Sequence, residues 1–462
     1  MDCGGRTPLW LHRPSIQRAW PHSPRSQSGN MFPQSISICL PVTSNRIFCK
    51  LRHCHPSRRC ASIRVARHPN AARAEQTFDD FMDLTRTAYG TWNGGRFMHF
   101  GEELSEERFI SVMRHAYDSG IRTFMTADVY GNGGADEMLG RALAGIPRDT
   151  YCLVGAVGHD FYSGKRDGSK GFPRFTNPQL RPPNQYADYL RMAAEKSLAR
   201  CKTDKFDCLL LHNPDSIGYS SDAVWKAMDK LKDAKLTDRL GIAPGPANGF
   251  SLDIILCMER FGPLLDWAMI ILNPLEPWPG SLCLPAAQKH DVKVITRVVD
   301  YGGLFHDDVK PGHKFGYGDH RTFRPAGWVE AGNAKMDRMR SVAEKHNLTM
   351  IQLASIWNLS QPAVHSVIPT IIQEADPKSK PIEAKVDELA KLPNLKLTAD
   401  ECAYLAEVGN NKGCMALKGA NRSHSGEPEA DHWGLSPDLE AVGKRWGIDP
   451  DKDLVCTHTS AA

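Results

Sequence analysis

Three features are missing from this chain of 462 residues, and each absence narrows its class. No apolar run approaches the roughly 18 residues that a membrane-spanning helix needs, so we expect no membrane span. The 13 cysteines include no C-x-x-C pair and no regular spacing, which disfavours a zinc site and a secreted disulfide framework. No glycine-rich dinucleotide fingerprint follows an early strand, which disfavours a doubly wound open sheet. We therefore expect reduced thiols, no bound metal and another α/β architecture.

Acidic residues are scarce at the start of the chain. Residues 1–75 carry twelve Arg or Lys against two acidic residues, which leaves a net charge of −6 on the rest. A folded portion of that sign has no general attraction for nucleic acid, so we expect no nucleic-acid partner. The Ser- and Arg-rich leader is typical of an organellar transit peptide, and its Ser and Pro content favours a plastid over a mitochondrion. The alternative is a disordered tail without targeting function, on a cytoplasmic protein.

Short apolar segments suited to buried strands alternate with segments of helical period across the middle of the chain. This alternation predicts parallel βαβ units. The expected strands are residues 123–125, 151–156, 206–211, 239–243, 267–272, 292–298 and 364–368. The expected helices include residues 186–201, 221–234, 251–261, 282–290 and 334–359. Long connections at residues 157–184 and 299–332 leave the carboxyl ends of expected strands, where we expect them to wall a site.

Two stretches carry a recognisable pattern. Residues 120–140 read GIRTFMTADVYGNGGADEMLG and combine a short apolar strand, a turn that delivers Tyr130 and the start of a helix. Residues 206–215 read FDCLLLHNPD and bring an apolar strand to its end at His212. Both stretches resemble signatures of the aldo-keto reductase family.

The resemblance implies a fold and a division of the chain. Aldo-keto reductases fold as a (β/α)8 TIM barrel, so an eighth strand is expected near residues 87–89. The barrel is expected to place its chemistry at the carboxyl ends of its strands. We predict three parts, which are a leader at residues 1–75, a barrel at residues 76–410 and a C-terminal extension at residues 411–462 that packs on the barrel.

The same resemblance implies a reaction. The family reduces carbonyl compounds with a nicotinamide cofactor, here expected to be NADP, and uses a Tyr, Lys, Asp and His group. Tyr130 matches the proton donor, and His212 matches the histidine that orients the substrate carbonyl. Met125 stands where the family has its Asp, and Ala156 stands at the Lys position. Loss of one partner alone would leave an unpaired buried charge, at a cost of about 3 to 5 kcal/mol, so we infer that the pair was removed as a unit.

Further site positions are expected from this resemblance and, for Arg297, from its place at the end of a strand. Cofactor contacts are expected from Asn273, Arg297 and Asp128. Arg297 ends an expected strand and is either an anion contact at the barrel mouth or a member of a structural ion pair. Trp92 and Asn93, in the first loop at the mouth, are expected to contact a small-molecule substrate.

Two functions remain open. The first is an NAD(P)H-dependent oxidoreductase with an incomplete proton relay. The second is a barrel that no longer uses nicotinamide, either a non-redox Tyr/His acid-base enzyme (a lyase, dehydratase or isomerase) or a non-catalytic binding subunit. Retention of Tyr130 and His212 favours chemistry, whereas the replacement of several expected cofactor contacts favours the second function.

Overall fold

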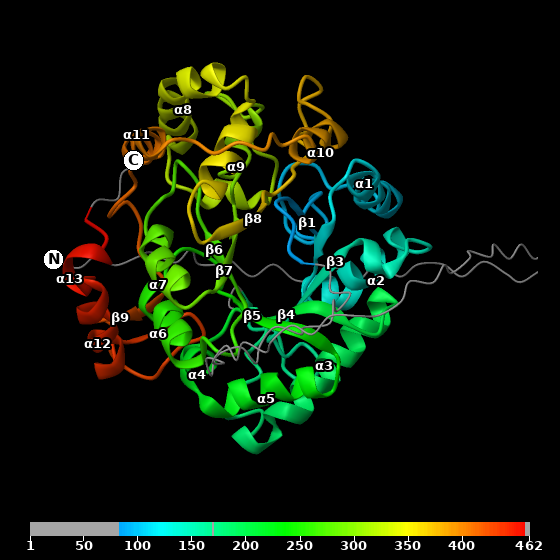
Figure 1. Ribbon diagram of the computed structural model, residues 1–462, viewed down its shortest axis with the longest axis vertical. Helices are drawn as coiled ribbons and strands as arrows, with labels where there is room; N and C mark the ends of the chain where they lie inside the picture. The colour runs from blue at the N-terminus through cyan, green and yellow to red at the C-terminus, as the bar shows by residue number, and fades with distance from the viewer. Residues whose placement is uncertain (1–82, 169–170, 458–462) are drawn as a thin grey trace, which may run out of the picture. The chain divides into compact units, whose positions relative to one another are not determined.

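The computed structural model describes residues 83–168 and 171–457, and the predicted leader lies outside these residues. Its central feature is an eight-stranded parallel sheet in which each strand pairs with the next along the chain. The strands are β1 (Ala88–Gly90), β2 (Thr123–Met125), β3 (Cys152–Val157), β4 (Phe206–His212), β5 (Thr237–Ala243), β6 (Trp267–Ile271), β7 (Lys293–Arg297) and β8 (Val364–Ile368). A parallel bridge between Thr87 and Val367 joins the last strand to the first. The predicted (β/α)8 barrel is therefore confirmed (Figure 1).

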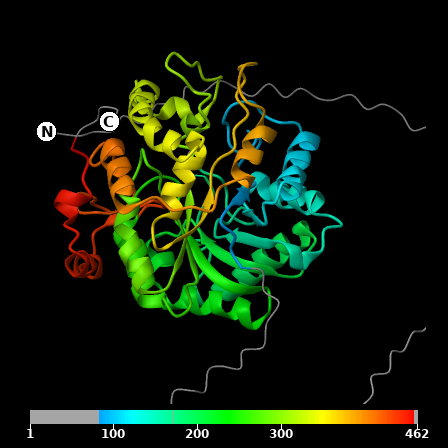
Figure 2. The ribbon, with the colours of Figure 1, turned by 45° about the horizontal axis from the view of Figure 1, so that its top comes forward.

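Helices surround the strands in both ribbon views (Figures 1 and 2). They connect successive parallel strands, as the crossover of a βαβ unit requires. The helices of the barrel are α1 (Glu106–Asp118), α2 (Gly134–Ala142), α3 (Tyr186–Cys201), α4 (Ser216–Ser220), α5 (Asp222–Asp233), α6 (Ser251–Phe261), α7 (Leu284–Lys289), α8 (Trp328–Lys345), α9 (Met350–Leu359), α10 (Ile382–Ala390) and α11 (Ala399–Gly409). The predictions of helices at residues 186–201 and 251–261 are confirmed.

The prediction of one helix over residues 334–359 is wrong, because the segment forms α8 and α9 with a break between them. Asn347 adopts a φ of 54°, in the left-handed region that ends regular helix. Thr349 then starts α9 through a capping box, in which its hydroxyl accepts from the Gln352 amide and the Gln352 side chain accepts from the Thr349 amide. Apolar periodicity alone did not reveal these two caps.

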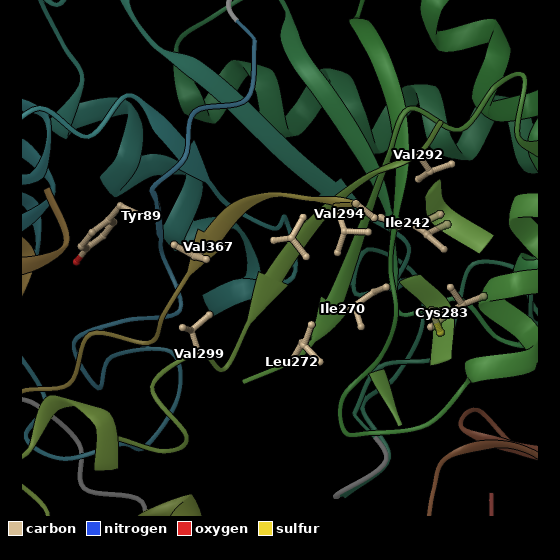
Figure 3. Close-up of a cluster of buried hydrophobic side chains, with 14 of the residues drawn as sticks. Tyr89, Ile242, Ile270, Leu272, Cys283, Val292, Val294, Val299 and Val367 are labelled. Carbon is tan, nitrogen blue, oxygen red and sulfur yellow. The ribbon is translucent and has the colours of Figure 1, made fainter. Parts of the chain in front are cut away.

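The alternation of side chains along each strand divides the apolar residues into two clusters. On β6, Trp267 and Met269 belong to the cluster inside the barrel, whereas Ala268 and Ile270 belong to the cluster between strands and helices. Figure 3 shows part of the outer cluster, including Ile242, Ile270, Val294 and Val367. The inner cluster fills the barrel below the strand ends, as in other barrels of this size. It also forms the floor of the site described next.

The C-terminal residues that the structure describes contact the barrel through tryptophan side chains. They form β9 (Gly419–Asn421), β10 (His432–Gly434), α12 (Pro437–Trp446) and α13 (Pro450–Asp453). Trp433 donates from Nε1 to Asp253 Oδ1 at 2.9 Å, and Trp446 donates from Nε1 to Glu259 Oε1 at 2.9 Å. Both carboxylates lie on α6, beside which Figure 1 shows α12. The domain boundary at residue 411 stays a prediction.

No helix within residues 83–168 and 171–457 is both long enough and apolar enough to cross a membrane. In the same residues, no group of three or more His, Cys, Asp or Glu side chains is placed to hold a metal ion.

Candidate functional site

Tyr130 lies at the carboxyl end of the barrel, five positions after the last residue of β2. Its amide donates to the Ala127 carbonyl at 3.0 Å, which closes a tight turn after the strand. Gly131 follows with a φ of 59°, a left-handed conformation that glycine adopts at little cost. A Cβ at Gly131 would also overlap the ring of Phe97. The glycine therefore lets the chain turn sharply and leaves Tyr130 partly exposed at the mouth.

His212 ends β4 and faces Tyr130. The two ring centroids are 5.5 Å apart, with the planes at 83°. Trp92, from the loop after β1, lies on the other side of Tyr130 with a centroid distance of 4.2 Å. His212 Nδ1 is buried and has no hydrogen-bond partner among the described residues. The structure thus brings together three of the predicted site residues, Trp92, Tyr130 and His212, from three segments that are distant in sequence.

Both titratable rings carry no charge at neutral pH. Burial raises the pKa of Tyr130 to about 12, with Arg297 opposing the rise and Asp128 adding to it. Burial lowers the pKa of His212 well below its ordinary value, and the neighbouring His159, Arg174 and Arg297 lower it further. Tyr130 is accordingly a phenol with a proton to donate, and His212 is a neutral imidazole.

Met125 and Ala156 form part of an apolar floor beneath these rings. The two side chains belong to the inner cluster against which Tyr130 packs, and they are 7% and 4% exposed. Met125 pairs with Val154 in the parallel register of β2 and β3, which places Ala156 two residues further along the same face. The two positions predicted to stand in for an Asp–Lys pair are therefore neighbours in one apolar environment.

Three other predicted residues are buried. Asp128 is 0% exposed, and its predicted cofactor contact stays a prediction. Asn93 is 3% exposed and accepts from the Ile371 amide at 2.9 Å, and its predicted substrate contact stays a prediction. Asn273 is 0% exposed, donates to the Val298 carbonyl at 3.0 Å and accepts from the Leu275 amide at 3.0 Å. The side-chain amides of Asn93 and Asn273 therefore join backbone segments of neighbouring loops.

His159 was not identified from the sequence, although it lies beside His212 with ring centroids 5.1 Å apart. Asn213 Nδ2 lies 3.0 Å from its Nε2, and Arg174 Nη1 lies 3.0 Å from its Nδ1. Burial and Arg174 together lower its pKa to about 3, so this ring is neutral as well. Its position two residues after β3, at the carboxyl end of a barrel strand, was the signal available in the sequence.

The sequence model of the Aldo/keto reductase family matches residues 87–409. This chain belongs to that family. Versiconal hemiacetal acetate reductase from Aspergillus parasiticus is 22% identical to this aldo/keto reductase and aligns with 71% of it and 94% of the relative. A probable voltage-gated potassium channel subunit beta from Arabidopsis thaliana is also 22% identical, over 64% of this chain and 85% of the relative. A solved glycerol dehydrogenase from Gluconobacter oxydans, 23% identical, has a TM-score of 0.55 and covers 70% of this chain and 91% of its own. The solved structure supports the fold.

The mouth of this aldo/keto reductase can be tested for its fit to a nicotinamide cofactor. The floor offers apolar surface at Met125, Ala156, Ala243 and Met269, each less than a tenth exposed, and such surface suits a flat aromatic ring. Arg297 lines a pocket at the same end of the barrel and has no ion-pair partner in the described part of the chain, which suits an anionic ligand. The residues present therefore fit the aromatic ring of such a cofactor, and Arg297 fits one anionic group, from either the cofactor or the substrate.

Proposed function

We propose that this aldo/keto reductase is an NAD(P)H-dependent oxidoreductase that reduces a small carbonyl compound, with Tyr130 as proton donor and His212 orienting the substrate. The observation that supports the proposal is the pairing of a protonated phenol with a neutral imidazole, 5.5 Å apart between ring centroids, at the carboxyl end of the barrel. Membership of the family supports an oxidoreductase. The cofactor supplies the hydride when it is bound.

Tyr130 provides the proton for the carbonyl oxygen. Because its pKa is raised to about 12, the phenol keeps its proton at any ordinary pH and releases it only as negative charge develops on that oxygen. A general acid of this kind contributes about 10²- to 10⁴-fold to the rate. Met125 and Ala156 bring no charge to assist it, so we expect a slower proton transfer than a complete relay would give.

His212 holds the carbonyl oxygen next to the phenol. A neutral imidazole carries one N–H donor, which can point at the oxygen without adding a charge that would have to be buried. The ring of Trp92 packs against Tyr130 and limits the positions that the phenol can take. Both contacts restrict the reacting groups to one geometry, which is how positioning lowers an activation barrier.

The test combines binding with turnover. We expect NADPH or NADH to bind the protein in a calorimeter, and Tyr130→Phe to keep that binding while kcat falls by about 10²- to 10⁴-fold on any carbonyl substrate found. Tyr404→Phe is the matched control, because this exposed phenol donates to the Arg338 carbonyl on α8 and lies outside the site. Full activity in Tyr130→Phe would place the acid elsewhere.

A second function is favoured by the apolar floor and by one relative. A site that lacks the Asp–Lys pair also suits a non-redox Tyr/His acid-base enzyme or a non-catalytic binding subunit, and one relative is a probable channel subunit. Absence of NADPH and NADH binding would favour this group. Within it, an activity lost in both Tyr130→Phe and His212→Ala would identify an enzyme, and an activity kept in both would identify a binding subunit.

A further inference from the structure

Arg297 is a cation at the mouth of the barrel that lacks a carboxylate partner. It ends β7, and its Nη2 donates to the Pro244 carbonyl at 2.8 Å and the Gly245 carbonyl at 3.3 Å. Its buried Nε has no acceptor, and no carboxylate in residues 83–168 or 171–457 lies within ion-pair distance of the guanidinium. Two carbonyl groups hold the side chain in place but leave its charge uncompensated.

Three buried arginines elsewhere in the described residues are neutralised within the protein. Arg174 pairs with Asp431 at 2.8 Å, Arg181 pairs with Asp160, and Arg321 pairs with both Asp319 and Glu374. Removing a charge from water without a partner costs several kcal/mol, and this cost is reflected in the pKa of Arg297, which burial lowers. Among these arginines, only Arg297 is placed to gain a counter-ion from a ligand.

Glu276 acts electrostatically on Arg297 but does not form an ion pair with it. The Glu276 carboxylate instead accepts from Asn248 Nδ2 at 2.7 Å and from Asn273 Nδ2 at 3.4 Å. It influences the charge on Arg297 from beyond ion-pair distance, and burial raises its own pKa. The charge of Arg297 is therefore open to a ligand anion.

A pocket next to Arg297 contains further unpaired donors. Residues 244–249, the connection from β5 to α6, line the pocket together with Arg297, and its empty volume, counted with the part open to solvent, is about 290 Å³. The backbone N–H groups of Gly245 and Ala247 donate to no acceptor within the described residues. A guanidinium and free amide groups around one hollow are the donors that recognise a carboxylate or a phosphate.

The anion site lies beside the reacting pair. His212 pairs with Ala243 in the register of β4 and β5, and Arg297 Nη2 donates to the carbonyl of Pro244, the next residue after Ala243. His212 in turn faces Tyr130. An anion on Arg297 is consequently close to the position that the proposed function gives to the reacting carbonyl. This proximity favours a charged group on the substrate itself.

We propose that Arg297, with the amide groups of Gly245 and Ala247, binds the carboxylate of the substrate, so that the substrates are keto acids or aldehyde acids. The proposal rests on the proposed function, because it takes the bound carboxylate to belong to a substrate of the reductase. The anion site itself can be tested without turnover. The same donors could receive a cofactor phosphate, which has the same chemistry. The experiment must separate these two sources.

The probes are pyruvate and its neutral isostere pyruvamide, with Arg297→Met, Arg297→Lys and Tyr130→Phe as variants. In calorimetry without cofactor, we expect wild type and Tyr130→Phe to bind pyruvate more tightly than pyruvamide. Arg297→Met should weaken pyruvate binding by about 10- to 100-fold, the loss expected for a hydrogen bond between charged groups, and leave pyruvamide binding unchanged. Arg297→Lys keeps the charge and is expected to fold even if Arg297→Met does not. It should weaken pyruvate binding by a smaller factor than Arg297→Met does and leave pyruvamide binding unchanged.

Three results would overturn the proposal. The first is equal binding of pyruvate and pyruvamide by the wild-type protein, or binding of neither. The second is a loss in the Arg297 variants that is the same for both probes. The third is weaker NADPH or NADH binding in these variants with pyruvate binding unchanged, which would assign the anion to the cofactor. Selective pyruvate binding by a protein that binds neither NADPH nor NADH would leave the anion site standing and refute the reductase instead.

Discussion

Restoring the charged pair to the barrel floor tests the interpretation of Met125 and Ala156. Met125→Asp alone places a carboxylate in a cluster whose other members are apolar, and Ala156→Lys alone places an ammonium there. Because each position is less than a tenth exposed, each single charge is expected to lower the free energy of unfolding by about 3 to 5 kcal/mol. Much of that cost will appear as a shifted pKa of the introduced Asp or Lys, because a buried titratable group becomes neutral at a pH where it would be charged in water.

The double variant should recover part of this loss. Met125 and Ala156 lie on one face of adjacent strands, two residues apart in register, so the new Lys can reach the new Asp. We expect a coupling free energy of about 1 to 3 kcal/mol between the two substitutions. A lysine close to Tyr130 also favours the tyrosinate, so the double variant should have a lower Tyr130 pKa and a higher kcat than either single variant.

The assay is urea unfolding at pH 7 of the wild type, both single variants and the double variant, analysed as a double-mutant cycle. Met269→Asp combined with Ala156→Lys is the matched control, because Met269 is also 7% exposed in the same cluster but lies on β6, which is not a neighbour of β3. The reasoning is refuted if the Met125 and Ala156 substitutions are additive to within about 0.5 kcal/mol, or if the control pair couples as strongly.

Reductase kcat/KM should be flat from pH 5 to 8. The reason is that the Tyr130 phenol, with a pKa of about 12, and the neutral His212 imidazole do not change their protonation in this range. A change of slope in the profile near pH 6.5 would contradict this expectation. Burial raises the pKa of Asp253 from 3.8 to about 6. Between these two values the folded state binds more protons than the unfolded state. The free energy of unfolding should therefore fall by about 3 kcal/mol as pH rises from 3.8 to about 6. Asp253→Asn should remove that fall in melts recorded from pH 3.5 to 7, and an unchanged slope would show that another group titrates. Gly409→Ala should destabilise the protein by about 1 to 3 kcal/mol in urea, because its Cβ would overlap a backbone carbonyl of the β6–α7 connection, whereas Gly316→Ala, with open space around it, should have no effect.

The residues of the site differed in how far the sequence could predict them. Tyr130 and His212 were assigned through the resemblance of residues 120–140 and 206–215 to the aldo-keto reductase family, and both lie at the carboxyl ends of parallel strands, which meet at one end of a barrel. Asp128 and Asn93 were expected to contact ligands, and the structure adds that both are buried, which depends on contacts with segments distant in sequence. His159 was missed because its role depends on contact with His212, which lies 53 positions further along the chain.

The sequence by itself determined the parallel βαβ units and most of their elements, because alternation of apolar segments is a property of neighbouring residues, and the family resemblance of two stretches added the eight-stranded barrel. It also determined which chemical groups are available, including the replacement of two expected charges by Met125 and Ala156. Only the tertiary structure decided that these two side chains share one apolar floor, that Arg174, Arg181 and Arg321 find carboxylates, and that Arg297 finds none. The physical reason is that burial and charge pairing depend on which distant segments the fold brings within a few ångströms of each other.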